Sequence, residues 1–203
     1  LAWSRGLGDV YKRQQENDAW IQKQHIKLAK RPKRETLTFT AGDTLYYLGK
    51  PYTLTHSTER HSIQITDQTI VIPTKQNRSQ TSTNAPSPKK TYALLTKWYK
   101  EKATDIIEDR ISIFQEKLGL APKKWHIRNT KKRWGSCNSR QEITINWRLI
   151  MAPLDVLDYV IIHELCHLKF LDHSKSFWKL VKDYDPNYRD HKKWLETYQD
   201  TLS

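Results

Sequence analysis

The sequence predicts an α+β fold, in which a small antiparallel β-rich unit precedes a largely helical domain. Short runs rich in Thr, Tyr and Ile, separated by turn signals, occupy residues 36–72. Apolar residues at helical spacing fill residues 92–118. A third pattern, helical and strongly apolar in its first half, begins at Pro153 and carries two histidines four residues apart.

Composition divides the chain into four segments. Residues 1–14 resemble the translation of a sequencing adapter, so we expect them to be foreign to the fold. On this interpretation the natural N-terminus is missing, and a lost signal peptide stays possible. Residues 15–73 are predicted to form a truncated N-terminal β-rich unit. Residues 74–91, rich in Ser, Thr, Asn, Pro and Lys, are predicted to be a flexible linker or insertion, and residues 92–203 the main domain.

Each element follows from a local signal. Residues 16–30 have the pattern of a short helix that must end before Pro32. The expected strands are residues 36–40, 44–48, 52–55, 62–66, 69–72, 125–128 and 142–146. Gly119 is expected to end the helix over 92–118. Further helices are expected from Pro153, from Ser174, and around Tyr188 to Tyr198.

Charge and cysteine content limit the partners and the compartment. The formal net charge is +13, which is compatible with acidic partners, but it is spread along the chain and no DNA-reading motif is evident. Cys137 and Cys166 stand in unlike contexts and make no disulfide framework, which fits a reducing compartment. No apolar run approaches a membrane span. We expect a cytoplasmic protein with no membrane partner; the sequence indicates no oligomeric state.

Residues 163–167 read His-Glu-Leu-Cys-His. On a helix, His163 and His167 lie about 40° apart and can bind one ion. Glu164 projects to the side of that face, where it can reach a water on the metal. Zinc prefers imidazole nitrogen, and a catalytic zinc keeps one position for a water whose pKa it lowers to about 7. The motif therefore predicts a zinc-dependent hydrolase of the zincin kind, with Glu164 as the catalytic residue that activates the zinc-bound water.

A catalytic zinc needs a third protein ligand, for which His173 is the first candidate. The helix must then end near Phe170 and turn, which agrees with Ser174 capping the next helix. Glu196, on a later helix, is the alternative. The spacing from His167 to His173 matches that of metzincins, but Phe170 replaces their glycine and no methionine follows for a Met-turn. An ordinary metzincin is thereby excluded.

Two neighbours of the motif have less certain roles. Tyr159 falls one helical turn before His163, where it is either a core residue or a hydrogen-bond donor to a developing oxyanion. Cys166 lies on the flank opposite Glu164 and is expected to be a small buried residue rather than a metal ligand.

A longer series of motifs resembles one known family. The series is Arg133–Cys137, Ile145–Leu149, Ala152–Pro153, Tyr159–Val160, His163–His167, His173–Lys175 and Phe177–Trp178. This order resembles the YgjP-like metallopeptidase-domain family, relatives of the SprT-like and WLM zincins, over residues 94–195. The resemblance implies a zinc site of His163, His167 and His173 with Glu164 as general base. It also implies that the Trp134–Cys137 loop lies near the active centre.

Three activities are consistent with these features. The leading hypothesis is a metallopeptidase acting on a peptide or protein. The second is a metal-dependent nucleoside-triphosphate pyrophosphatase, an activity attributed within the family, which would use basic residues such as Lys131, Lys132 and Arg133. The lack of a Gly-rich phosphate loop of the Walker kind counts against it. The third, by analogy with SprT-like proteins, is a protease acting on nucleic-acid-bound proteins.

Overall fold

A computed structural model of the chain describes residues 17–18, 20–23, 25–26, 29, 37–74, 85–130, 133–198 and 201–202. The chain divides into two units, Leu1–Arg34 and Glu35–Ser203. The described residues of the first unit are helical and exposed, as expected for the helix over 16–30. The prediction for residues 1–14 lies outside the described residues, as do residues 75–84 of the predicted linker. The predicted segment boundaries stay predictions.

The first sheet of the second unit has four described strands. They are β1 (Thr44–Tyr47), β2 (Lys50–Ser57), β3 (Gln64–Ile65) and β4 (Thr69–Pro73), in the order β1-β2-β4-β3. The β1–β2 and β3–β4 pairs are antiparallel, but the central pair, β2 with β4, is parallel. The sheet is thus mixed: two of its three pairings are antiparallel, as the sequence predicts, and the β2–β4 pairing is not. Residues 37–40 are not a strand as expected: they form an irregular segment in which Phe39 N donates to Asp43 Oδ2 at 2.6 Å.

The turn between β1 and β2 attaches this sheet to the segment that leads into the motif helix. Leu48 N donates to the Ile150 carbonyl at 2.8 Å, and Gly49 N donates to the Met151 carbonyl at 3.2 Å. Gly49 has a φ of +77°, and a Cβ there would lie 2.8 Å from atoms of Pro153. Only glycine allows this backbone conformation and this close approach together.

The rest of the second unit carries the helices and a second sheet. The elements are α2 (Pro88–Leu118), β5 (Lys124–Arg128), β6 (Gly135–Cys137), β7 (Glu142–Asn146), the 3₁₀ helix η1 (Trp147–Met151), α3 (Leu154–Cys166), α4 (Lys175–Tyr184) and α5 (Tyr188–Tyr198). Gly119, in the left-handed conformation, ends α2 as predicted. The sheet order is β5-β7-β6, with β5 parallel and β6 antiparallel to β7.

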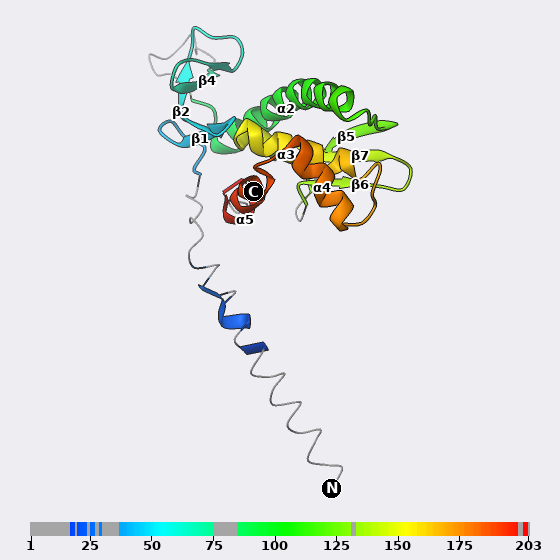
Figure 1. The fold of residues 1–203 in the computed structure, drawn as a ribbon. Coiled ribbons are helices and arrows are strands. Elements are labelled where there is room, and N and C mark those ends of the chain that lie inside the picture. Colours follow the sequence, from blue (N-terminus) through cyan, green and yellow to red (C-terminus); the bar gives the residue numbers. More distant parts are fainter. Residues whose placement is uncertain are drawn as a thin grey trace. The chain divides into compact units, whose positions relative to one another are not determined.

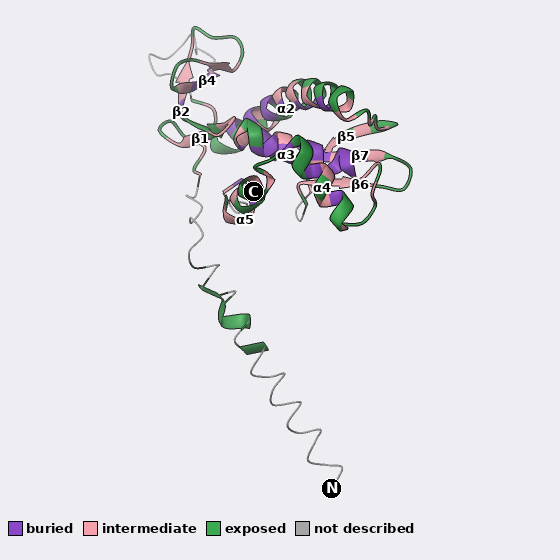
Figure 2. Cartoon of the chain, in the orientation of Figure 1, coloured by how far each residue is buried: buried purple, intermediate pink, exposed green. Residues whose placement is uncertain are grey.

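Helix α3 lies at the centre of this part of the molecule (Figures 1 and 2), where α2, η1, α4, α5, β6 and β7 all contact it. It is apolar on nearly all sides, as a buried helix must be. Two polar contacts hold neighbours against it. Arg110 of α2 donates to both carboxylate oxygens of Asp158, at 2.6 and 2.5 Å. His191 Nε2 of α5 lies 3.5 Å from Asp155 Oδ2 of α3. The other ring nitrogen, Nδ1, lies 2.8 Å from Oδ2 of Asp185, which ends α4.

Within the described ranges, no helix combines enough length with enough apolar character to cross a bilayer.

Candidate metal centre and active site

The chain turns sharply after the motif helix. Helix α3 ends at Cys166 with His167 as its C-cap, a few residues earlier than expected. Lys169 N and Phe170 N both donate to the Cys166 carbonyl, at 3.1 and 3.0 Å. The next helix begins at once, because Ser174 Oγ caps α4 by accepting a hydrogen bond from Phe177 N at 3.4 Å. These two helix ends form a short loop that carries His173.

The structure brings the three predicted histidines together. Nε2 of His163 lies 3.2 Å from Nε2 of His167 and 3.1 Å from Nε2 of His173. The ligand atoms of all three lie within 4.8 Å of one another, the spacing of a group that could hold an ion. Tetrahedral zinc with bonds of 2.0–2.1 Å would set its nitrogens about 3.3 Å apart. The donor set therefore fits the metal that the sequence predicts.

The protonation of two imidazoles suits a metal ligand. His167 Nδ1 lies 2.9 Å from the Phe170 carbonyl oxygen, and because a carbonyl only accepts, Nδ1 carries a proton; in the neutral ring this leaves the lone pair on Nε2. Burial, together with the neighbouring His167 and His173, lowers the pKa of His163 to about 3. His163 is thus neutral at physiological pH, as metal binding requires. Its Nδ1 is buried and makes no hydrogen bond to the described residues.

Aromatic side chains of α4 hold the histidine rings. Phe177 stacks on His167, with ring centroids 4.5 Å apart, and Trp178 stacks on His173 at 5.5 Å. Tyr159 makes an edge contact with His163 at 5.9 Å. The His-Glu-Leu-Cys-His motif gives no indication of this role for Phe177 and Trp178. Both residues lie in the first turn of the helix that Ser174 caps, directly after His173, and this position could have indicated that they contact the histidines. The oxyanion role suggested for Tyr159 stays a prediction.

Glu164 is buried against strand β6. Its side chain is only 5% exposed, and a Cβ added to Gly135 of β6 would lie 2.5 Å from Glu164 Oε1. The Trp134–Cys137 segment therefore contacts the candidate base, at its glycine. Burial raises the pKa of Glu164 to about 8, against the opposing charge of Arg133. A cation bound beside this carboxyl would favour its ionised form.

Comparison with known proteins decides the family. The sequence model of the YgjP-like metallopeptidase domain matches residues 9–198. This chain belongs to the YgjP-like family. A YgjP-like domain of the metallopeptidase class is expected to use a metal, and the three-histidine cluster can hold one.

Two known proteins are similar to this chain in sequence or in structure. The chain is 28% identical over 92 residues to a UTP pyrophosphatase of Escherichia coli (strain K12), an alignment that covers 43% of this chain and 52% of that protein. It thus spans about half the length of this relative. The crystal structure of the metallopeptidase zymogen of Pyrococcus abyssi abylysin has 24% identity and a TM-score of 0.42, over 48% of this chain and 99% of the other.

The other residues that the sequence suggested have different environments or lie outside the described residues. Among the described residues, the group able to hold an ion consists of His163, His167 and His173, and Glu196 is not a member. Cys166 is buried as predicted, and burial raises the pKa of its thiol to about 12. Burial and then the charge of Glu164 raise the pKa of the Cys137 thiol to about 11. Lys131 and Lys132 lie outside the described residues.

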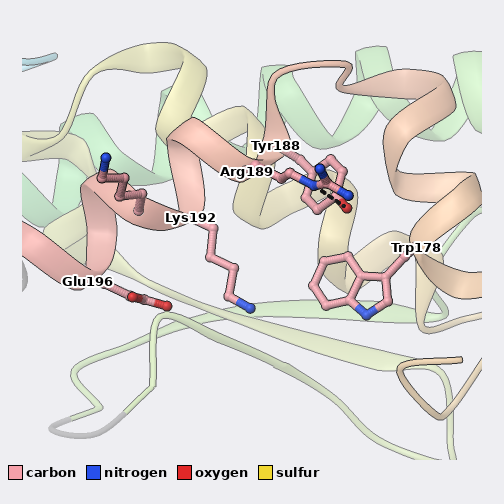
Figure 3. A pocket seen from close by; sticks show the side chains of 6 residues that line it. Trp178, Tyr188, Arg189, Lys192 and Glu196 are labelled. Atoms are coloured by element: carbon pink, nitrogen blue, oxygen red, sulfur yellow. Dashed lines mark hydrogen bonds between the residues drawn. The ribbon is translucent and has the colours of Figure 1, made fainter. Parts of the chain in front are cut away.

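A pocket of about 420 Å³ lies beside the candidate centre. It is lined by Trp178, Tyr188, Arg189, Lys192, Lys193 and Glu196. Trp178 belongs both to this pocket and to the wall of the metal centre, because its ring stacks on His173. Lys192 reaches from α5 toward the space between Trp178 and Glu196 (Figure 3), and its Nζ lies 5.1 Å from the Trp178 ring centroid. Sequence reasoning did not find this pocket, because its residues come from two separate helices.

Proposed function

We propose that this YgjP-like domain is a zinc-dependent metallopeptidase, in which His163, His167 and His173 hold the zinc and Glu164 is the general base. The observation that supports it best is the spacing of the three Nε2 atoms, 3.1 and 3.2 Å from His163 to the other two. A buried carboxyl directly follows His163 on the same helix. Three imidazoles with one such carboxyl are the ligand set and base of a hydrolytic zinc site.

Each residue has a defined task. Zinc, when bound, lowers the pKa of a coordinated water to about 7 and polarises the carbonyl oxygen of a substrate. Glu164 accepts the proton of the attacking water and passes it to the leaving amine. Phe177 and Trp178 keep His167 and His173 in place by stacking on their rings. Burial of Glu164 limits its contact with bulk water, which favours proton exchange with the reacting groups.

The second sheet supports a peptide as the substrate. Strand β6 lies at the edge of the described order β5-β7-β6, and Gly135 in this strand contacts Glu164. The open side of an edge strand presents backbone N–H and C=O groups to which an extended peptide can pair. A peptide bound there would pass beside Glu164.

A second candidate function is hydrolysis of nucleoside triphosphates to release pyrophosphate. Two observations favour it: the name of the Escherichia coli relative and the cations Arg189, Lys192 and Lys193 in the pocket beside His173. The same zinc and Glu164 would activate the water. The third hypothesis, a protease acting on nucleic-acid-bound proteins, stays a prediction that rests on the analogy with SprT-like proteins and on the positive net charge. The expected cytoplasmic location also stays a prediction.

Metal analysis together with two substrate panels tests these proposals. We expect about one zinc per wild-type chain and markedly weaker zinc binding by His173→Ala. Glu164→Gln should keep the zinc but lose about 10²–10⁴-fold of the activity, the usual contribution of a general base. Cleavage of a mixed peptide library supports the peptidase. Release of pyrophosphate from UTP without peptide cleavage would replace it with the second candidate. Full activity of Glu164→Gln on both panels would refute the assigned base.

A further inference from the structure

The pocket between α4 and α5 has an excess of positive charge. Three cations, Arg189, Lys192 and Lys193, line it with a single carboxylate, Glu196. Arg189 is held in a defined position, because its Nε donates to the Tyr188 hydroxyl at 3.2 Å and its guanidinium lies 5.8 Å from the Tyr188 ring centroid. Figure 3 shows this hydrogen bond at one end of the pocket and Lys192 crossing toward Trp178. Such an arrangement recognises an anion.

The pocket lies close to the proposed zinc ligands, and therefore close to the bond that would be cut. Trp178 stacks on His173 at 5.5 Å and also lies 5.7 Å from His163, measured between ring centroids. Trp178 therefore separates the pocket from two of the proposed zinc ligands by the width of one side chain. A group held in the pocket would belong to a substrate residue next to the scissile bond rather than to a distant one.

The Trp178 ring of the pocket already contacts other side chains of the protein. The Trp178 ring contacts His173, Tyr188 at 5.3 Å, and the Lys192 ammonium at 5.1 Å. These contacts favour charge recognition through Lys192 and Arg189 over stacking of a nucleobase on Trp178. Lys192 would also stand close to a bound zinc cation, and an anion between them would relieve this repulsion.

We propose that this pocket is a specificity subsite for an acidic side chain of the peptide substrate, with Lys192 and Arg189 as the residues that bind its carboxylate. The inference rests on the proposed peptidase function. It makes the enzyme selective for Glu or Asp beside the bond that it cuts. Both cations are exposed, so the selectivity is moderate and sensitive to salt.

A matched pair of peptides tests the subsite. The two peptides are identical except for Glu or Gln at the position next to the scissile bond, and the assay measures kcat/KM with the zinc-loaded protein. We expect the Glu peptide to be preferred by about five-fold at low salt, and less at 0.5 M NaCl. Lys192→Glu and Arg189→Glu should each abolish this preference, and the double variant should favour a Lys peptide. Lys182→Glu, an equal charge change at an exposed position of α4 outside the pocket, should leave the preference as in the wild type.

The outcomes separate this inference from the proposed function. Efficient cleavage with equal rates for Glu and Gln peptides, or an unchanged ratio in Lys192→Glu, overturns the subsite but leaves the peptidase intact. Cleavage of no peptide by zinc-loaded protein overturns the peptidase, and with it the subsite as a determinant of peptide specificity. Calorimetric titration with inorganic triphosphate tests whether the pocket binds a phosphate group instead of a carboxylate side chain. Triphosphate binding that needs Lys192 and Arg189, with no binding of the Glu peptide, assigns the pocket to phosphate and refutes the acidic side chain.

Discussion

Replacement of Gly135 by alanine tests how the proposed base is positioned. The added Cβ would lie 2.5 Å from Glu164 Oε1, 2.6 Å from its Cγ and 2.8 Å from its Cδ. An ordinary van der Waals contact begins at 3.4 Å, so the carboxyl end of Glu164 must move by about 0.9 Å. Because Glu164 is only 5% exposed, its neighbours leave little room for this movement.

Two magnitudes follow for Gly135→Ala. Overpacking of a buried site lowers the free energy of unfolding by about 1–3 kcal/mol. A displacement near 1 Å of a catalytic group lowers kcat/KM by about 10²-fold. Zinc binding should persist, because the proposed ligands are three histidines and not Glu164. The signature is therefore a zinc-loaded, folded protein with little peptidase activity.

The assay combines zinc stoichiometry, urea unfolding and peptide cleavage. Gly119→Ala is a matched control: Gly119 has a φ of +64°, and nothing lies within 4 Å of its Cβ position. It should cost about 1 kcal/mol of stability from backbone strain while leaving kcat/KM unchanged. Combining Gly135→Ala with Glu164→Asp should recover part of the lost stability, because the shorter side chain vacates the space, but not the activity. A Gly135→Ala enzyme with kcat/KM within two-fold of the wild type would refute the assigned role of the Glu164 position.

Two substitutions and one labelling experiment test contacts and burial around the site. Asp158→Asn leaves Arg110 without its counter-charge at a largely buried contact, and should lower the free energy of unfolding by about 2 kcal/mol in urea denaturation; an unchanged midpoint would contradict the contact. Gly49→Ala should lower it by about 1–3 kcal/mol, because its Cβ would lie 2.8 Å from Pro153; calorimetry showing an unaltered Tm would count against this docking. The raised pKa of about 11 keeps Cys137 a thiol at pH 8, so iodoacetamide should label it slowly there and faster as the pH rises toward 11; rapid labelling at pH 8 would oppose this.

The helix that carries His163 and His167 could be predicted from the sequence because its signals are local. A helical repeat of 3.6 residues places His163 and His167 on one face whatever the surroundings. The return of His173 could also be predicted, because Ser174 is a capping residue and a cap requires the preceding helix to end. The structure confirms the cap and brings the three side chains together.

Other features depend on pairing across the chain, about which local patterns carry no information. The alternation in β2 and β4 predicts strands but gives no direction, and the two strands proved to be parallel. Strand β6 has only three residues, Gly135–Cys137, too few to show a period. The pocket beside His173 combines Trp178 of α4 with Lys192 of α5, and this meeting depends on how the two helices pack.

The hydrogen bonds from Leu48 and Gly49 to Ile150 and Met151 have a consequence for any attempt to shorten the protein. A fragment that begins at α2 would retain every proposed zinc ligand and Glu164, but it would leave two backbone carbonyls without their donors at the entrance to α3. Water would replace these donors on a surface that is covered in the intact chain. The β1–β2 hairpin thus supports the start of the helix that carries the proposed zinc ligands His163 and His167. Shortened versions should lose rigidity at this point while they still contain all the proposed ligands.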